Sequence, residues 1–131
     1  MSSILAIAKG VAEKLASYNA EVMFAPEFEL RKMQEMRVVV LPVGKKRKFL
    51  TRSSFENGDA VDVAVIHKCR EESAVPELLS LVEKIGSELL GVRIGTSLCF
   101  EAKWEPLFSV EELRTKGLFI SVIQFIFKEM A

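Results

Sequence analysis

The segment Leu118–Lys128 limits most strongly what this chain can fold into, because it is apolar on both faces of an extended strand. β-branched and aromatic residues favour strands. A strand with two apolar faces is covered on both sides. The residues of one face are Phe119, Ile123, Phe125 and Phe127, and those of the other are Ile120, Val122 and Ile126. Two interpretations follow: two helices of the chain cover opposite faces of the sheet, or another copy buries one face.

Other segments also have strand character. Asp59–Cys69 alternates apolar and polar residues with period two, and Met36–Leu41 contains three consecutive valines before Pro42, which is expected to end it. Leu98–Trp104 is a further predicted strand. Glu21–Phe28 is extended but contains Pro26, so it is predicted to be an edge strand or a bent one.

Two amphipathic helices are predicted at Ser2–Tyr18 and Pro76–Leu90, from apolar residues spaced three and four apart. Asn19 and Gly91 are suited to the positions just after them. Ser73, with Glu77, could cap the start of the second helix. A short helix is expected to begin after Ser109 and to end at Gly117.

The predicted order is therefore α–β–β–β–α–β–short α–β. Strands that follow one another with few crossover helices indicate an α+β fold. We expect a mixed, largely antiparallel sheet of about five strands, packed by two main helices. The length of 131 residues and the apolar content of 50% suit a single domain spanning residues 1–131.

The insert Gly44–Gly58 between two good strands is long for a hairpin connection, which usually takes 2–5 residues. Asn57-Gly58 is a turn signal at its end. If the strands continue into the insert, it forms a protruding hairpin arm at residues 44–58. Five basic residues against Glu56 give the arm a charge of +4. The candidate interface residues are Lys45, Lys46, Arg47, Lys48, Phe49, Arg52 and Phe55.

Phe49 and Phe55 are unusual in so polar an arm. An exposed aromatic residue lowers solubility unless something covers it, so one hypothesis is that a neighbouring subunit does. The alternative is a flexible basic loop whose phenylalanines fold back on their own domain. The run Lys45–Lys48 could also neutralise phosphates, but it lacks the aromatic interleaving of a base-stacking surface. A contact with an acidic protein surface is favoured.

The sequence contains no motif that indicates catalysis, a metal or a cofactor. His67 and Cys69 share a strand face, but a zinc site needs four ligands or three plus water. Glu101, Glu105, Glu111 and Glu112 are interpreted as a solvated segment and a helix first turn. We therefore expect no enzyme. Two cysteines are too few for a disulfide framework, and no segment has the length or polarity of a signal peptide or a membrane span. A reducing cytosol is expected.

The layout resembles the tail terminator proteins of long-tailed bacteriophages, also called tail completion or minor tail protein U-like proteins. The resemblance lies in the opening helix Ile4–Tyr18, "FAPEFEL" at Phe24–Leu30, "MRVVVLPVG" at Met36–Gly44 and the re-entry "DAVDVAVIHK" at Asp59–Lys68. It continues with the helix "VPELLSLVEKIGSELLG" and with "EPLFSVEELRTKGLFISVIQFIFK" at Glu105–Lys128.

This resemblance implies a virion protein of the phage neck, assembled in the bacterial host cytoplasm. Members of the tail terminator family form rings, commonly hexamers, that cap the tail tube and join it to the head-tail connector. The implied partners are further copies of the chain, the tail tube protein and the connector protein, with DNA passing through the lumen without sequence-specific binding. The alternatives are another connector or head-completion adaptor protein, or a small nucleic-acid-binding module that uses the basic arm.

Overall fold

The computed structural model describes residues 4–23, 37–49, 55–68, 74–103 and 108–129, with side chains for all of these except 44–49, 55–57, 116 and 129. The elements are α1 Ile4–Lys14, a 3-10 helix η1 Ala16–Tyr18, β1 Glu21–Val22, β2 Arg37–Phe49, β3 Phe55–Lys68, α2 Val75–Leu89, β4 Arg93–Ile94, β5 Ser97–Lys103, α3 Val110–Lys116 and β6 Leu118–Glu129.

The strands form one sheet with the order β1-β2-β3-β6-β5-β4. β1 is parallel to β2, and the other pairs are antiparallel. The predicted α+β fold with a mixed, largely antiparallel sheet is therefore confirmed. The described sheet has six strands where about five were expected. The additional strand is β4, which contributes only two residues. So short a strand leaves no periodicity in the sequence.

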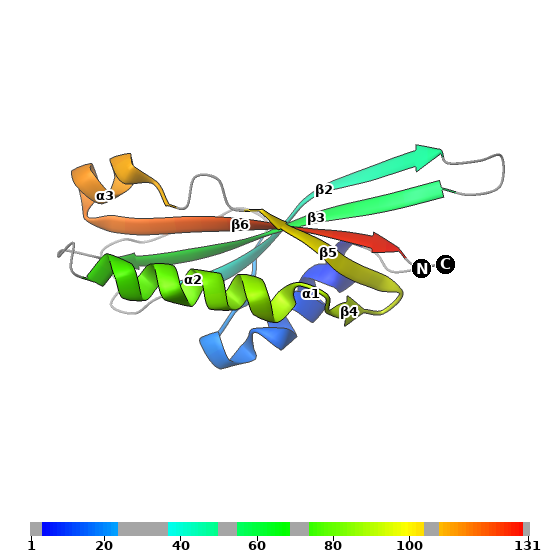
Figure 1. Ribbon diagram of the computed structural model, residues 1–131, viewed down its shortest axis with the longest axis horizontal. Helices are drawn as coiled ribbons and strands as arrows, with labels where there is room; N and C mark the ends of the chain where they lie inside the picture. The colour runs from blue at the N-terminus through cyan, green and yellow to red at the C-terminus, as the bar shows by residue number, and fades with distance from the viewer. Residues whose placement is uncertain (1–3, 24–36, 50–54, 69–73, 104–107, 130–131) are drawn as a thin grey trace.

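Both long helices pack on the same face of this sheet (Figure 1). Val11 and Leu15 of α1 and Val82 and Ile85 of α2 share one buried cluster with alternate residues of the central strands. These strand residues are Val61, Val63, Val65, Phe119, Ile123, Phe125 and Phe127, each with 0% exposure. The interpretation that the two helices cover opposite faces is wrong. The face that both helices cover carries the buried phenylalanines of β6 and most of the fully buried side chains.

The sheet face opposite α1 and α2, called the open face below, carries smaller and more polar residues. Ala60, Asp62 and Ala64 of β3 face Ile126, Gln124 and Val122 of β6 in the strand register. A second, smaller cluster on this face contains Val39, Ala64, Ile66 and Leu118. Beside this cluster Val122 is 39% exposed, whereas Gln124, Ile126 and Lys128 farther along β6 are half-buried.

The predicted helix boundaries fit the observed ends. Asn19 adopts the left-handed conformation after η1, with φ 56°, and Gly117 does so after α3, with φ 62°. The hydroxyl of Ser109 accepts a hydrogen bond from the Glu112 amide at 3.3 Å, as a helix N-cap does. α2 begins after Ala74, which has no side-chain cap. The proposed cap Ser73 lies outside the described residues.

Two predictions for the β2–β3 region are wrong: a strand end at Pro42 and a turn at Asn57-Gly58. Pro42 does not end its strand: β2 continues to Phe49, with Pro42 opposite Val61 and a register shift between Pro42 and Gly44. A bulge is one of the few places where a strand tolerates proline, which has no amide hydrogen. Asn57 and Gly58 lie inside β3, opposite Arg47 and Lys46. The ladder continues past them, so the chain does not reverse there.

The β6 edge next to β5 is covered by two different elements. β5 pairs only with the second half of β6, from Gln124 to Glu129. Along the first half, the Ser109 amide donates to the Ile120 carbonyl at 3.0 Å, and the Phe108 ring stacks on Phe119 with centroids 5.6 Å apart. The loop before α3 thus continues the cover that β5 begins.

A close contact joins α1 to the short strand β4. A Cβ atom built on Gly10 would lie 2.5 Å from Cγ2 of Ile94. That methyl group is attached to the branched Cβ of isoleucine, whose χ1 torsion is stiff, so it cannot easily move aside. The absence of a side chain at position 10 is therefore what lets the helix approach β4.

We predict that Gly10→Ala destabilises the fold although alanine favours helices by about 1 kcal/mol over glycine. Overpacking typically costs about 1–3 kcal/mol, so a net loss of about 1 kcal/mol is expected in urea unfolding. In an Ile94→Ala background the same substitution should be neutral or stabilising. A stabilising effect of Gly10→Ala in the unaltered chain would contradict this packing.

Candidate assembly interface

The arm begins where β6 ends. The last β3–β6 pair is Gly58 with Lys128, whereas β2 and β3 stay paired for three more positions, to Phe49 opposite Phe55. At ~3.3 Å per residue this places the Phe49–Phe55 pair about 10 Å beyond the last pair with β6. Figure 1 shows the two strands projecting from the rest of the sheet.

The structure places most of the sequence-predicted interface residues on the two-stranded arm or at its root. Lys45, Lys46, Arg47, Lys48 and Phe49 lie on β2, and Phe55 begins β3. Arg52 lies outside the described residues. The register sets Lys48 opposite Glu56, so one basic position faces an acidic one, and it sets the two phenylalanines opposite each other.

Two β-bulges flank the root of the arm. Pro42 and Gly44 pair with the consecutive residues Val61 and Ala60, so Val43 is an extra residue in β2. Cys99 and Glu101 pair with the consecutive residues Phe127 and Ile126, so Phe100 is an extra residue in β5. Because Ala60 and Ile126 are partners in β3 and β6, both bulges lie at nearly the same level of the sheet. Bulges bend strands and increase their twist.

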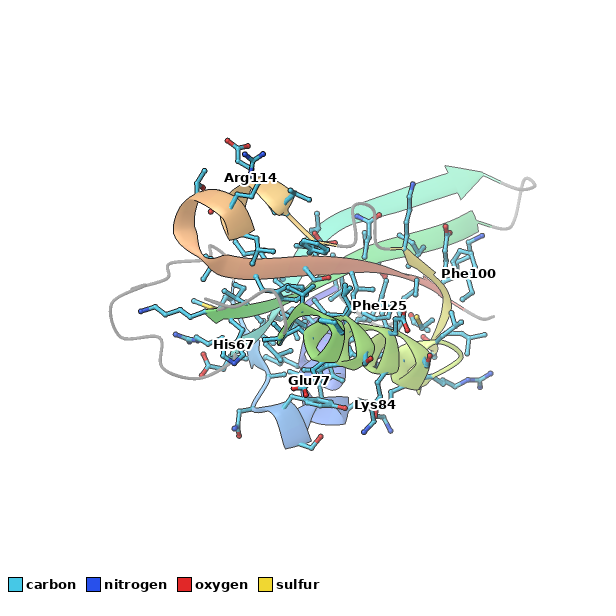
Figure 2. All side chains as sticks on the ribbon, turned by 60° about the vertical axis from the view of Figure 1, so that its left-hand side comes forward. His67, Glu77, Lys84, Phe100, Arg114 and Phe125 are labelled. Atoms are coloured by element: carbon cyan, nitrogen blue, oxygen red, sulfur yellow. The ribbon has the colours of Figure 1, made fainter. Side chains whose placement is uncertain are left out.

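Each bulge exposes its extra hydrophobic residue. Val43 is 53% exposed beside Gly44, and Phe100 is 41% exposed. The Lys128 ammonium lies over the Phe100 ring, 4.1 Å from its centroid, which places the ring at the end of β6. We use the name open-face patch for four residues at or near this level of the sheet: the exposed bulge residues Val43 and Phe100, with Val122 and the half-buried Ile126 of the open face. Phe100 and Phe125 are labelled in Figure 2, and Phe125 is fully buried in the core.

Val43 and Phe100 were not among the interface residues predicted from the sequence. Their exposure results from the bulges, and a bulge leaves no periodic signal in a single sequence. Val122 and Ile126, by contrast, were already visible as the second apolar face of the last strand.

A half-buried carboxyl lies beside this patch. Asp62 of β3 is opposite Gln124 of β6. Burial raises the pKa of Asp62, and a hydrogen bond from the Gln124 side chain partly opposes that rise. Within the described part of the chain, its Oδ1 atom is buried without a hydrogen-bond partner. The ionised form of Asp62 therefore lowers the stability of the fold.

We predict that Asp62→Asn stabilises the chain at pH 7. A carboxyl whose pKa is raised on folding favours the fold in its neutral form, and this contribution is lost as pH rises through the folded pKa. The advantage of the asparagine should therefore disappear as the pH falls below 3.8, the ordinary pKa of aspartate. Urea unfolding at pH 7 and pH 3, at one protein concentration, measures it.

The matched control is Glu101→Gln, which removes one charge from an exposed residue near the patch. A surface substitution of this kind stays within about 0.5 kcal/mol. Equal effects of the two substitutions at pH 7 would show that burial of Asp62 has no energetic consequence.

His67 and Cys99 are far apart in the sheet. His67 is opposite Phe119 and Cys99 is opposite Phe127, so they lie eight residues apart along β6, about 26 Å. Glu111 and Glu112 form the first turn of α3, as expected. Among the described residues no group of three or more His, Cys, Asp or Glu could hold a metal ion. Cys69 and Glu105 lie outside them.

Cys99 is a free, fully buried thiol in β5. Burial raises its pKa from 9.0 to about 11, more than its backbone hydrogen bonds with Glu101 and Gly91 lower it. Since the thiolate is the reactive form, such a thiol is inert at neutral pH.

We predict that Cys99 in a Cys69→Ser variant reacts with Ellman's reagent at pH 8 only after unfolding by urea. The raised pKa stabilises the fold below pH 9, and this contribution is lost between pH 9 and about 11. Rapid reaction of the native variant would show that the β5 edge opens readily.

Every helix in the described ranges is too short or too polar to cross a membrane. No protein-family model and no curated protein matches the chain. Its fold is similar to that of a solved structure, a chain from the "Virion of native gene transfer agent (GTA) particle". The TM-score is 0.51 at 9% sequence identity, over 91% of this chain and 81% of that chain. At this identity the likeness concerns the fold.

Proposed function

We propose that the chain is a structural subunit of a phage virion, a tail terminator that forms a ring, caps the tail tube and joins it to the head connector. The observation that carries the proposal is the paired arm, which extends beyond β6 and ends in two facing phenylalanine positions. The similar fold of a chain from a gene transfer agent virion supports a role in a virion.

A ring subunit needs two different surfaces that match each other and close by rotation. The arm supplies one protruding surface and the open-face patch a second. To end a tube, one side of the ring must fit the last tube ring, while the other side must not accept a further one. The ring proposed here is a hexamer that contacts the tube protein and the connector, located in the neck of a virion assembled in the host cytoplasm.

DNA would pass through the lumen of such a ring without being read. In this proposal the subunit has neither catalytic activity nor a cofactor. The basic run Lys45–Lys48 would then serve protein contacts. A connector or head-completion adaptor subunit of this fold would use the same arm, and its binding partner would distinguish it from a terminator.

The test is native mass spectrometry of the chain, alone and mixed with the tail tube protein of the same phage. We predict a closed oligomer in at least one of these samples. The double variant Phe49→Asp and Phe55→Asp should stay folded but lose the oligomer, because two buried carboxylates replace two apolar contacts. Circular dichroism and thermal unfolding measure its folding.

Val110→Asp is the matched control, since Val110 is 56% exposed at the start of α3, where an acidic residue is well tolerated. It should assemble like the unaltered chain. A strictly monomeric chain in both samples would exclude the ring. Loss of folding in the phenylalanine variant would instead assign these residues to the core of their own domain.

A further inference from the structure

We propose that the arm of one copy packs on the open-face patch of the next copy, so that Val43, Phe100, Val122 and Ile126 receive the arm. This inference rests on the ring proposed above and specifies its contact. It assigns the two halves of the interface to different parts of the same chain.

The patch is apolar surface that α1 and α2 do not cover. Val43, Phe100 and Val122 are 53%, 41% and 39% exposed. Exposed hydrophobic residues that neighbour one another on a soluble protein mark a candidate interaction site. Because α1 and α2 both pack on the other face, these elements cannot reach the patch without unfolding the core.

The arm is the part of a second copy that fits this surface. Its two phenylalanine positions lie about 10 Å beyond the end of β6, so the described strands of its own sheet do not reach them. The two phenylalanine residues of the arm and an apolar receiving surface complement each other. Contact between them would remove the exposed apolar area of the patch from water.

Charge selects the arm over a second open face as the occupant. Five of the 18 basic residues and one of the 18 acidic residues lie in residues 44–58, so the arm carries +4 and all other residues together carry −4. Two open faces packed against each other would join two identical charge patterns and would not use the opposite net charges of arm and body. An arm on the body of another copy instead joins opposite net charges.

The charged groups around the patch are compatible with this docking. Asp62 and Glu101 border Ile126. Of the two lysines there, Lys128 already lies over the Phe100 ring, and Lys103 is exposed at the β5 end, opposite Gln124. The interface is therefore heterologous: each copy gives one arm and receives another.

A heterologous contact can be tested by complementation between two defective chains. The arm variant is Phe49→Asp with Phe55→Asp, which keeps an intact patch. The patch variant is Val122→Lys, which keeps an intact arm and places a cation where the basic arm would dock. Each variant alone should be monomeric by native mass spectrometry. Their equimolar mixture should form a one-to-one dimer and nothing larger, because only one functional contact remains.

Leu90→Lys is the control for the patch variant. Leu90 is 51% exposed directly after α2, a helix that packs on the other face of the sheet. It should assemble like the unaltered chain. If Val122→Lys does not fold, Phe100→Ser takes its place, since Phe100 is an extra residue of a bulge.

The outcomes separate this inference from the ring itself. If the unaltered chain assembles and both patch variants assemble equally well, the patch is not the receiving surface, while the ring stands. If the arm variant alone still dimerises and the mixture forms no mixed dimer, the contact joins two identical faces and this inference is wrong. If the unaltered chain never assembles, the ring fails first.

Discussion

The packing of both long helices on one face of the sheet is the constraint on which the rest of the structure depends. The central strands place valines and phenylalanines on that face, and α1 and α2 bury them completely. A side-chain cluster of this size accounts for most of the favourable free energy of folding. The second face is left with a smaller cluster and a partly exposed apolar row. The chain thus folds by itself and still retains apolar surface for another molecule.

The two bulges let the edge strands serve both faces at once. An extra residue in β2 and another in β5 are accommodated without shifting the core residues on either side. In β5, for example, Cys99 before the bulge and Ala102 after it both belong to the core side, while Phe100 between them is exposed. A regular strand with one more residue would have moved all following side chains to the opposite face. The bulges thus add hydrophobic surface to the open face at little cost to the core.

Much of the fold could be predicted from the sequence, because β3, β6 and the two helices have strong periodic patterns. Ser109 and Gly117 marked the ends of α3 through local chemistry, which a single sequence records well. The continuation of β2 through Pro42 and the pairing of Asn57 inside β3 could not be predicted, since both depend on the partner strand. The strand β4 has only two residues, too few to leave a periodic pattern. The candidate interface was likewise predicted only in part. The arm residues were visible as charge and aromatic anomalies, whereas the exposure of Phe100 depends on a bulge in the folded sheet.

The composition of the arm also bears on how copies of the chain can meet. Among the described strands, β1 pairs with β2 only at Val39 and Val40, so none of them pairs with the outer edge of β2 from Leu41 onward. An open edge of this kind invites pairing with another chain unless it is blunted by lysines, proline or a bulge. β2 has all three in this stretch: Pro42, the bulge at Val43, and the basic run that begins at Lys45. Uncontrolled edge pairing between free copies is thereby disfavoured. An assembly contact made through side chains on the sheet face does not need that edge, and it is therefore compatible with the protection that the basic residues provide.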